Sequence, residues 1–319
     1  MSTTSLVLSS QVGGDTELNM LHLELIHHWS NGLYKSFLLS GDSSSQIYVD
    51  TCIKHGLRHP FLMRQILATS ALHISIERPD QRAFYHQHAN QLQSDALAGF
   101  NTILQGLDES NILAAFLVSS LIGTHVFCET FLFREATHDT FNSTLDSLIG
   151  CINLLRGIRS IISDWWSFLC ESELGSVLMS ANEQRDAYKQ ASNEIGVLNQ
   201  MVDAADIGIP SREAYKKTIQ ELEKVFAAQS QLDDLQASTS ANMVFSWLVL
   251  VPKEFVELLS ARRPEALVIL SYYAVVLHHR RKFWAINDAG EYLIPGIGSH
   301  LGRHWDQWLA WPRQVIATS

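Results

Sequence analysis

The sequence of 319 residues contains only four cysteines, and they lie far apart. Cys52, Cys128, Cys151 and Cys170 are separated by 76, 23 and 19 residues, and none belongs to a CxxC pair. Structural zinc sites are assembled from closely spaced ligand pairs, so this spacing excludes a zinc finger or zinc cluster built from these residues. The apolar neighbours of the cysteines predict small buried thiols in a reducing compartment.

Basic residues are also scarce, because 23 Lys and Arg stand against 33 Asp and Glu, for a formal net charge of −10. Non-specific binding of nucleic acid depends on neutralising phosphates, so this balance argues against direct contact with DNA or RNA. The first residues lack the basic region of a signal peptide, and the nearly apolar stretch 266–277 is too short for a membrane span. We therefore expect a soluble, cytoplasmic protein without a nucleic-acid or membrane partner.

Several motifs that carry chemistry are absent: a GxGxxG after a strand, a P-loop, a GxSxG elbow, HExxH and an Asp-rich magnesium cluster. The histidines that lie close in sequence are His27 with His28, His55 with His59, His86 with His88, and His278 with His279. Adjacent histidines on a helix point about 100° apart, which is poor geometry for sharing an ion. Only His55 and His59 have the spacing of one helix face, and Gly56 and Pro60 interrupt a helix there. We expect no metal site and no cofactor.

Helical periodicity dominates the chain. Residues 17–29 place their apolar side chains at spacings of three and four, and Pro60 suits the first turn of another helix. Residues 111–129 are apolar almost all round, which predicts a helix in the middle of a bundle. Since alternating strand-like runs are absent, we predict an all-α fold. It is a single bundle of about a dozen helices over residues 17–319, after a disordered lead of residues 1–16.

The last third of the chain is rich in large rings. Five of the eight tryptophans lie there, and they are Trp247, Trp284, Trp305, Trp308 and Trp311. Aromatic side chains fill cores and also line ligand cavities, so both interpretations stay open at this point.

Six strings occur in an order typical of one family. They are LELIHHW (23–29), HPFLM (59–63), LATSALHIS (67–75), YHQHANQLQSDAL (85–97), RPEALVILSYYAVVLHH (263–279) and HWDQWLAWP (304–312). Together they resemble the C-terminal regulatory domain of fungal zinc-cluster transcription factors of the sterol-uptake-regulator type. The resemblance implies an all-helical domain whose C-terminal helices enclose an apolar pocket, which binds a sterol in the regulators. The six clustered cysteines and basic linker of those regulators are not found in this sequence.

Two uses of such a pocket follow from the resemblance. One is a zinc-cluster-less regulator or sensor, nuclear in location, that binds a sterol-like ligand. The other is a cofactor-free enzyme of fungal secondary metabolism, because stand-alone proteins of those pathways include pericyclases. Among them are hetero-Diels–Alderases that join a tropolone o-quinone methide to a humulene-type sesquiterpene. The missing cluster makes the enzyme our preferred hypothesis. Either use implies an apolar small-molecule partner, such as a terpenoid, polyketide or sterol, and leaves a homodimer open.

The chemistry of a pericyclase divides the candidate residues into two groups. Holding two partners in a near-attack arrangement supplies up to about 7–11 kcal/mol, and a donor on the carbonyl oxygen about 2–4 kcal/mol more. The candidate substrate-binding residues, on apolar or aromatic segments, are Phe245, Trp247, Tyr272, Trp284, His73 and His125. The candidate catalytic residues, which supply a hydrogen bond or a proton, are Tyr273, His278 and Arg281.

Each candidate also has a purely structural interpretation. The histidines suit core imidazoles bonded to a backbone carbonyl, and the tyrosines suit core packing with the hydroxyl at a polar rim. Arg281 suits the charged end of a helix, where cations offset the helix dipole.

Overall fold

The computed structural model describes residues 19–33, 43–134, 140–179, 193–230 and 242–318. These residues form α-helices, short 3₁₀ segments and turns, with no strand among them. The prediction of an all-α bundle is confirmed. The predicted lead at residues 1–16 lies outside the described residues.

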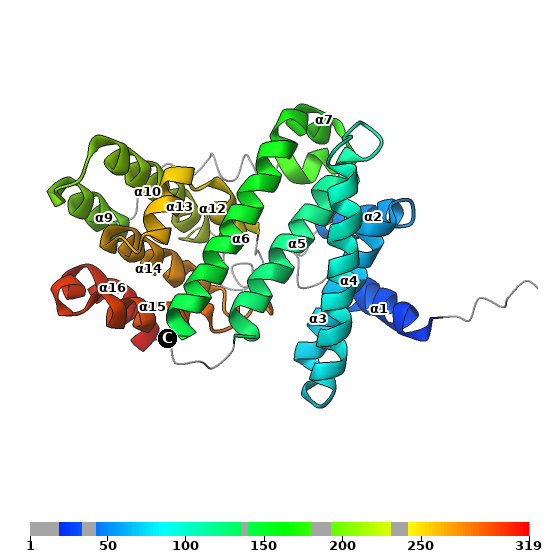
Figure 1. Ribbon diagram of the computed structural model, residues 1–319, viewed down its shortest axis with the longest axis horizontal. Coiled ribbons are helices and arrows are strands. Elements are labelled where there is room, and N and C mark those ends of the chain that lie inside the picture. The colour runs from blue at the N-terminus through cyan, green and yellow to red at the C-terminus, as the bar shows by residue number, and fades with distance from the viewer. Residues whose placement is uncertain (1–18, 34–42, 135–139, 180–192, 231–241, 319) are drawn as a thin grey trace, which may run out of the picture.

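Four helices from the start of the chain and the short α7 form an N-terminal lobe, on the right of Figure 1. Its helices are α1 (Met20–Asn31), α2 (Ser43–Gly56), α3 (Pro60–Glu77), α4 (Arg82–Ile103) and α7 (Trp166–Glu171). Pro60 occupies the first turn of α3, as predicted, because its fixed φ and missing N–H cost nothing there. A short 3₁₀ segment, Pro79–Gln81, turns the chain so that α4 packs along α3.

Two long helices, α5 (Ile112–Leu132) and α6 (Thr140–Ile162), lie between the lobes (Figure 1). By length and composition α5 could cross a membrane, but 78% of its most apolar window is buried inside the protein. It therefore occupies the position of a central bundle helix, which confirms the prediction made from its apolar sequence.

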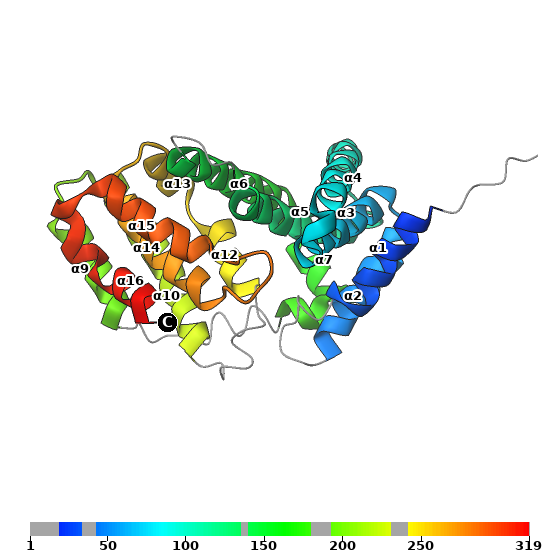
Figure 2. The same ribbon diagram turned by 90° about the horizontal axis from the view of Figure 1, so that it is seen from below.

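The remaining helices form a C-terminal lobe, on the left of Figures 1 and 2. They are α9 (Asn193–Ala204), α10 (Ile209–Ser230), α12 (Asn242–Leu250), α13 (Lys253–Ser260), α14 (Pro264–His279), α15 (Ala289–Leu301) and α16 (Asp306–Thr318). Helix α14 is buried along almost its whole length, and it packs against α15 and α16. It is the core helix of this lobe.

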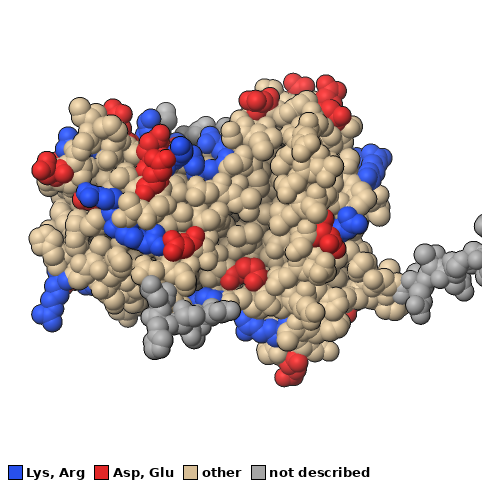
Figure 3. Space-filling view, in the orientation of Figure 1, with Lys and Arg blue, Asp and Glu red and all other residues tan. Residues whose placement is uncertain are grey.

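The connection between α14 and α15, residues 280–288, lies where the two lobes pack against each other. Buried apolar side chains form two clusters, one chiefly of the N-terminal lobe and one that extends from α1 to α16. Trp284, in this connection, packs against both clusters. On the face in Figure 3, basic and acidic side chains are interspersed over a mostly uncharged surface.

Candidate functional site

Two of the predicted residues stack in the core of the C-terminal lobe. The rings of Trp247 and Tyr273 lie 4.2 Å apart and 17° from parallel. The Trp247 indole N–H donates to the carbonyl oxygen of Thr218 at 3.3 Å, and the Tyr273 hydroxyl donates to that of Val244 at 3.2 Å. Burial raises the pKa of Tyr273 well above its usual value. In this arrangement both polar groups are satisfied by backbone carbonyls, so Tyr273 packs in the core with its hydroxyl buried and not at a polar rim.

Tyr272 lies near the stack but points elsewhere. Its ring is 5.1 Å from that of Trp311 on α16, and burial raises its pKa to about 12. The structure thus places Tyr272 and Tyr273 against different neighbours, because adjacent positions on α14 point in different directions.

Three other predicted residues come together where the lobes meet. Phe245 of α12 contacts the rings of Phe127 and Phe283, at 5.2 and 6.3 Å. Phe283 is 5.7 Å from Trp284, and the rings of Trp284 and His73 of α3 make a T-shaped contact with their centres 5.1 Å apart. We call these five rings, Phe127, Phe245, Phe283, Trp284 and His73, the junction row. It runs without a break from α5 through the 280–288 connection to α3.

A buried arginine begins that connection. Arg280 is 3% exposed, and its Nε and Nη1 have no hydrogen-bond partner among the described residues. Desolvation lowers the pKa of its guanidinium. Such buried N–H groups can bind a carbonyl or anionic oxygen in a planar fork. The residue predicted from the sequence is the neighbouring Arg281, which donates to the carbonyl oxygen of His278 at 3.1 Å as a helix-end residue does.

His278 is the second-last residue of α14 and is 2% exposed. Its Nδ1 lies 3.3 Å from a carboxylate oxygen of Glu291 on α15. Burial lowers the pKa of this imidazole and the nearby Arg281 adds to the effect, while Glu291 opposes it. Nδ1 has no hydrogen-bond partner among the described residues, so the carboxylate is a close neighbour of the ring at the α14–α15 contact.

His125 lies in α5 and is fully buried. Neither of its ring nitrogens has a hydrogen-bond partner among the described residues, although a Glu129 carboxylate oxygen is 3.8 Å from Nε2. Desolvation lowers its pKa to about 3, and His86 adds to the effect. The expected bond to a backbone carbonyl is therefore not what holds this imidazole in place.

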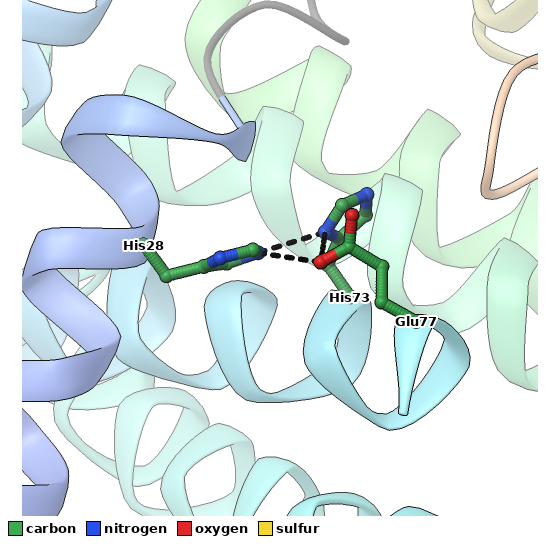
Figure 4. Close-up of side chains that lie close together, drawn as sticks. All are labelled: His28, His73 and Glu77. Carbon is green, nitrogen blue, oxygen red and sulfur yellow. Dashed lines mark hydrogen bonds and ion pairs between the residues drawn. The ribbon is translucent and has the colours of Figure 1, made fainter. Parts of the chain in front are cut away.

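A third group of polar side chains lies at the α1–α3 contact (Figure 4). His28 Nε2 and His73 Nδ1 are 2.8 Å apart, so one ring donates to the other. The Oε2 atom of Glu77 is 3.7 Å from the first nitrogen and 3.6 Å from the second. Burial lowers the pKa of both histidines, to about 4 for His73. Both rings are consequently neutral near pH 7.

This group was not predicted, because His28 and His73 are far apart in the sequence. His73 and Glu77 are four residues apart, the spacing of one helix face, and this was the available signal. The pair that was considered instead, His55 and His59, stacks its rings at 6.2 Å. There His55 Nε2 lies 2.5 Å from a carboxylate oxygen of Glu173, which is its acidic partner.

Two hollows open on the surface. One, of about 290 Å³, adjoins the 280–288 connection, and its wall includes Arg82, Phe131, Arg134 and Asp288. The other, of about 480 Å³, lies between α1 and α2. The C-terminal helices, where the resemblance implies an enclosed apolar pocket, form neither of these two hollows.

Comparison with known proteins identifies the family. The fungal specific transcription factor domain matches residues 24–201, which is more than half of the chain. The chain belongs to this family. A Zn(2)-C6 fungal-type transcription factor of Gibberella zeae is 22% identical over 306 residues, 93% of this chain and 62% of the relative. Sterol uptake control protein 2 of Saccharomyces cerevisiae is 21% identical over 299 residues, 89% of this chain and 31% of the relative.

The chain spans less than two thirds of the length of either relative. Its family match covers the N-terminal lobe, α5 and α6, and so includes His28, His73 and Glu77. The alignment to the Gibberella regulator leaves out only 7% of the chain, so it must extend into the C-terminal lobe and its aromatic core. The resemblance inferred from the six strings is confirmed.

Proposed function

We propose that this chain is a ligand-sensing regulatory domain that binds an apolar small molecule with one polar end at the lobe junction. The observation that carries the proposal is the buried Arg280, whose guanidinium has N–H groups without a partner among the described residues. Burying such donors unpaired is costly, and a ligand oxygen would remove that cost. A sterol-like molecule combines one oxygen function with a large apolar body.

The junction row supplies apolar surface for the rest of the ligand. Phe283 and Trp284 follow Arg280 within the same connection, and Phe245 of α12 contacts Phe283. Transfer of apolar surface from water contributes about 25 cal/mol per Å², so an apolar body bound against rings contributes most of the affinity. The polar end then fixes the orientation.

The location suits a sensor as well as a binder. Because Trp284 packs against both hydrophobic clusters, a ligand that moves the 280–288 connection alters the contact between the lobes. A ligand shifts a conformational equilibrium only by the difference in its affinity for the two states. Its contacts with the 280–288 connection would differ between two arrangements of the lobes, and this supplies the difference in affinity. The regulators among the relatives support this function, and a nuclear location goes with it.

The test is binding of a fluorescent sterol, dehydroergosterol, to the purified full chain, measured by energy transfer from tryptophan. Arg280→Met keeps the apolar stem and removes the guanidinium, so we expect a stable protein that binds at least tenfold more weakly. Arg281→Met is the matched control, because that side chain contacts the His278 carbonyl, and we expect near wild-type affinity. Equal affinity of Arg280→Met and wild type would contradict the proposed site.

A regulatory role is tested separately by fusing the chain to an unrelated DNA-binding domain in a reporter strain. We expect transcription to change with sterol supply for wild type and not for Arg280→Met. If transcription does not change with sterol supply although the purified chain binds sterol, the chain is a carrier and not a regulator.

A second candidate is the pericyclase favoured in the sequence analysis. The observation in its favour is again Arg280, since a donor on a carbonyl oxygen lowers the barrier of a cycloaddition. EDTA-treated protein would be incubated with a tropolone quinone-methide precursor and humulene, and the product analysed by chiral chromatography. A single enantiomer formed faster than background would replace the regulator with an enzyme. Background rate with racemic product would reject this reaction.

A further inference from the structure

We propose that His28, His73 and Glu77 form a binding site for one divalent transition-metal ion, with Zn²⁺ the best match. The three side chains converge from α1 and α3 (Figure 4). Their nearest ligand atoms are His28 Nε2, His73 Nδ1 and Glu77 Oε2, all within 4.8 Å of one another. The site shares His73 with the junction row, but the observations behind it are separate from those at Arg280.

The distances between the ligand atoms suit a tetrahedral ion. Zinc bonds of about 2.0–2.1 Å at the tetrahedral angle place two ligand atoms about 3.4 Å apart. The two histidine–carboxylate distances are 3.7 and 3.6 Å, and the histidine–histidine distance is 2.8 Å. Only the last is short, because a hydrogen bond now joins the two nitrogens. An ion would replace that bond, and the two nitrogens would need to move apart by well under 1 Å to admit it.

The backbone holds the three side chains in place before an ion arrives. His73 and Glu77 stand one turn apart on α3, a helix buried along most of its length. His28 comes from α1, which packs on α3. A Cβ at Gly32 would come within 3.1 Å of the His28 ring, so the glycine leaves room for that imidazole. Sites carried by packed helices are held more precisely than sites on loops.

The ligand set indicates the class of ion. Two imidazoles and one carboxylate suit zinc and its divalent neighbours, whereas magnesium and calcium prefer oxygen ligands. The side chains of the two histidines are 14% and 10% exposed, and that of Glu77 is 53% exposed, so the carboxylate marks the path from solvent. Three protein ligands leave a fourth position for water or another ligand.

The surrounding charges permit a cation. Arg78 lies close enough to act on His28, but its guanidinium is paired with the Glu24 carboxylate at 2.7 Å. The repulsion that an ion would meet is thus largely compensated by a neighbouring acid.

A second histidine–glutamate group provides an internal comparison. His86 Nε2 and His125 Nε2 both face the carboxylate of Glu129, at 2.8 and 3.8 Å. The carboxylate lies between these two rings, whereas His28 and His73 meet each other directly. We therefore expect the ion at the first group and not at the second.

The experiment is a titration of the untagged, metal-free full chain with Co²⁺, followed by its visible absorption, and with Zn²⁺ by calorimetry. We expect one ion per chain, and a loss of affinity in His28→Gln and Glu77→Gln beyond the about 10–100-fold typical of an outer-shell partner. The matched controls are His27→Gln, an exposed neighbour on α1, and His86→Gln, and both should bind as wild type.

Three results would overturn the proposal: no binding by the wild type, unchanged affinity in His28→Gln or Glu77→Gln, or preference for Mg²⁺ or Ca²⁺. Because Glu77 is half-exposed, its variant is expected to fold, and circular dichroism checks this. A thermal-shift series with each ion gives a second readout, since an ion that binds only the folded chain raises its Tm.

Discussion

Replacement of Gly290 by alanine should separate α14 from α15. An ideal Cβ at this position lies 2.4 Å from the carbonyl oxygen of Ala274, 2.6 Å from the amide nitrogen of His278 and 2.8 Å from its Cβ. Ordinary contact begins at 3.4 Å, so the closest pair is 1.0 Å too near. Two of these atoms belong to the α14 backbone and cannot rotate away. The helix must move as a whole.

The size of the effect follows from two opposing contributions. Forcing an extra methyl group into a packed interior costs typically about 1–3 kcal/mol, and backbone neighbours place this case at the upper end. Alanine returns up to about 1 kcal/mol through its better helix propensity. We expect the free energy of unfolding to fall by about 2 kcal/mol.

Gly157 provides the matched control on α6. No atom lies within 4 Å of an ideal Cβ there, and the residue is exposed. Gly157→Ala should therefore raise stability by up to about 1 kcal/mol. Urea denaturation followed by tryptophan fluorescence measures both variants. If Gly290→Ala is as stable as Gly157→Ala, the close approach of α14 and α15 does not exist in solution.

Two further predictions concern buried rings. His125 is neutral in the folded chain because burial lowers its pKa from 6.5 to about 3, with Glu129 and His86 facing it. In the unfolded chain this histidine takes up a proton below pH 6.5, while in the folded chain it stays neutral. The free energy of unfolding should therefore fall by about 1.4 kcal/mol per pH unit as pH falls toward 3. Urea midpoints at pH 7, 6 and 5 should fall less steeply for His125→Phe, and parallel curves would contradict this. Trp247→Ala leaves a cavity at a fully buried site, so the free energy of unfolding measured by urea denaturation should fall by about 3–5 kcal/mol. A fall below about 1 kcal/mol would contradict the stacking of Trp247 on Tyr273.

Much of the fold was predictable because its signals are local. The apolar residues of α5 surround the helix, and only a position among other helices can bury all of them. Pro60 marks the start of α3 for a similar reason, since its ring is compatible with a first turn and disrupts a later one. Such features depend on neighbours within a few residues, which the sequence states directly.

The candidate site was less predictable because it depends on contacts between helices. His28 and His73 are 45 residues apart and meet only through the packing of α1 on α3. Arg280 belongs to a run of basic residues that resembles a solvated helix end, yet its side chain turns inward. No periodicity distinguishes it from Arg281. The direction of a side chain after a helix ends is set by tertiary packing, not by spacing.

Trp284 connects the two proposed sites, so the binding of metal and of sterol should be coupled. Its ring meets His73 at 5.1 Å and lies in the connection that begins at Arg280. An ion that fixes His73 favours one position of Trp284, and a ligand that orders the connection favours one as well. Linkage requires that each changes the affinity of the other by the same factor, typically about 5–150-fold for coupled sites.

The measurement is Co²⁺ affinity with and without dehydroergosterol, and sterol affinity with and without Co²⁺. We expect equal factors in wild type and a factor near one in Trp284→Leu, whatever the separate affinities of that variant. Coupling that persists in Trp284→Leu would mean that the lobes communicate through another contact, with the packed pair α5 and α6 the next element to test. Independent binding in wild type would mean that the junction row is rigid, and a sensor could not then use it as its moving part.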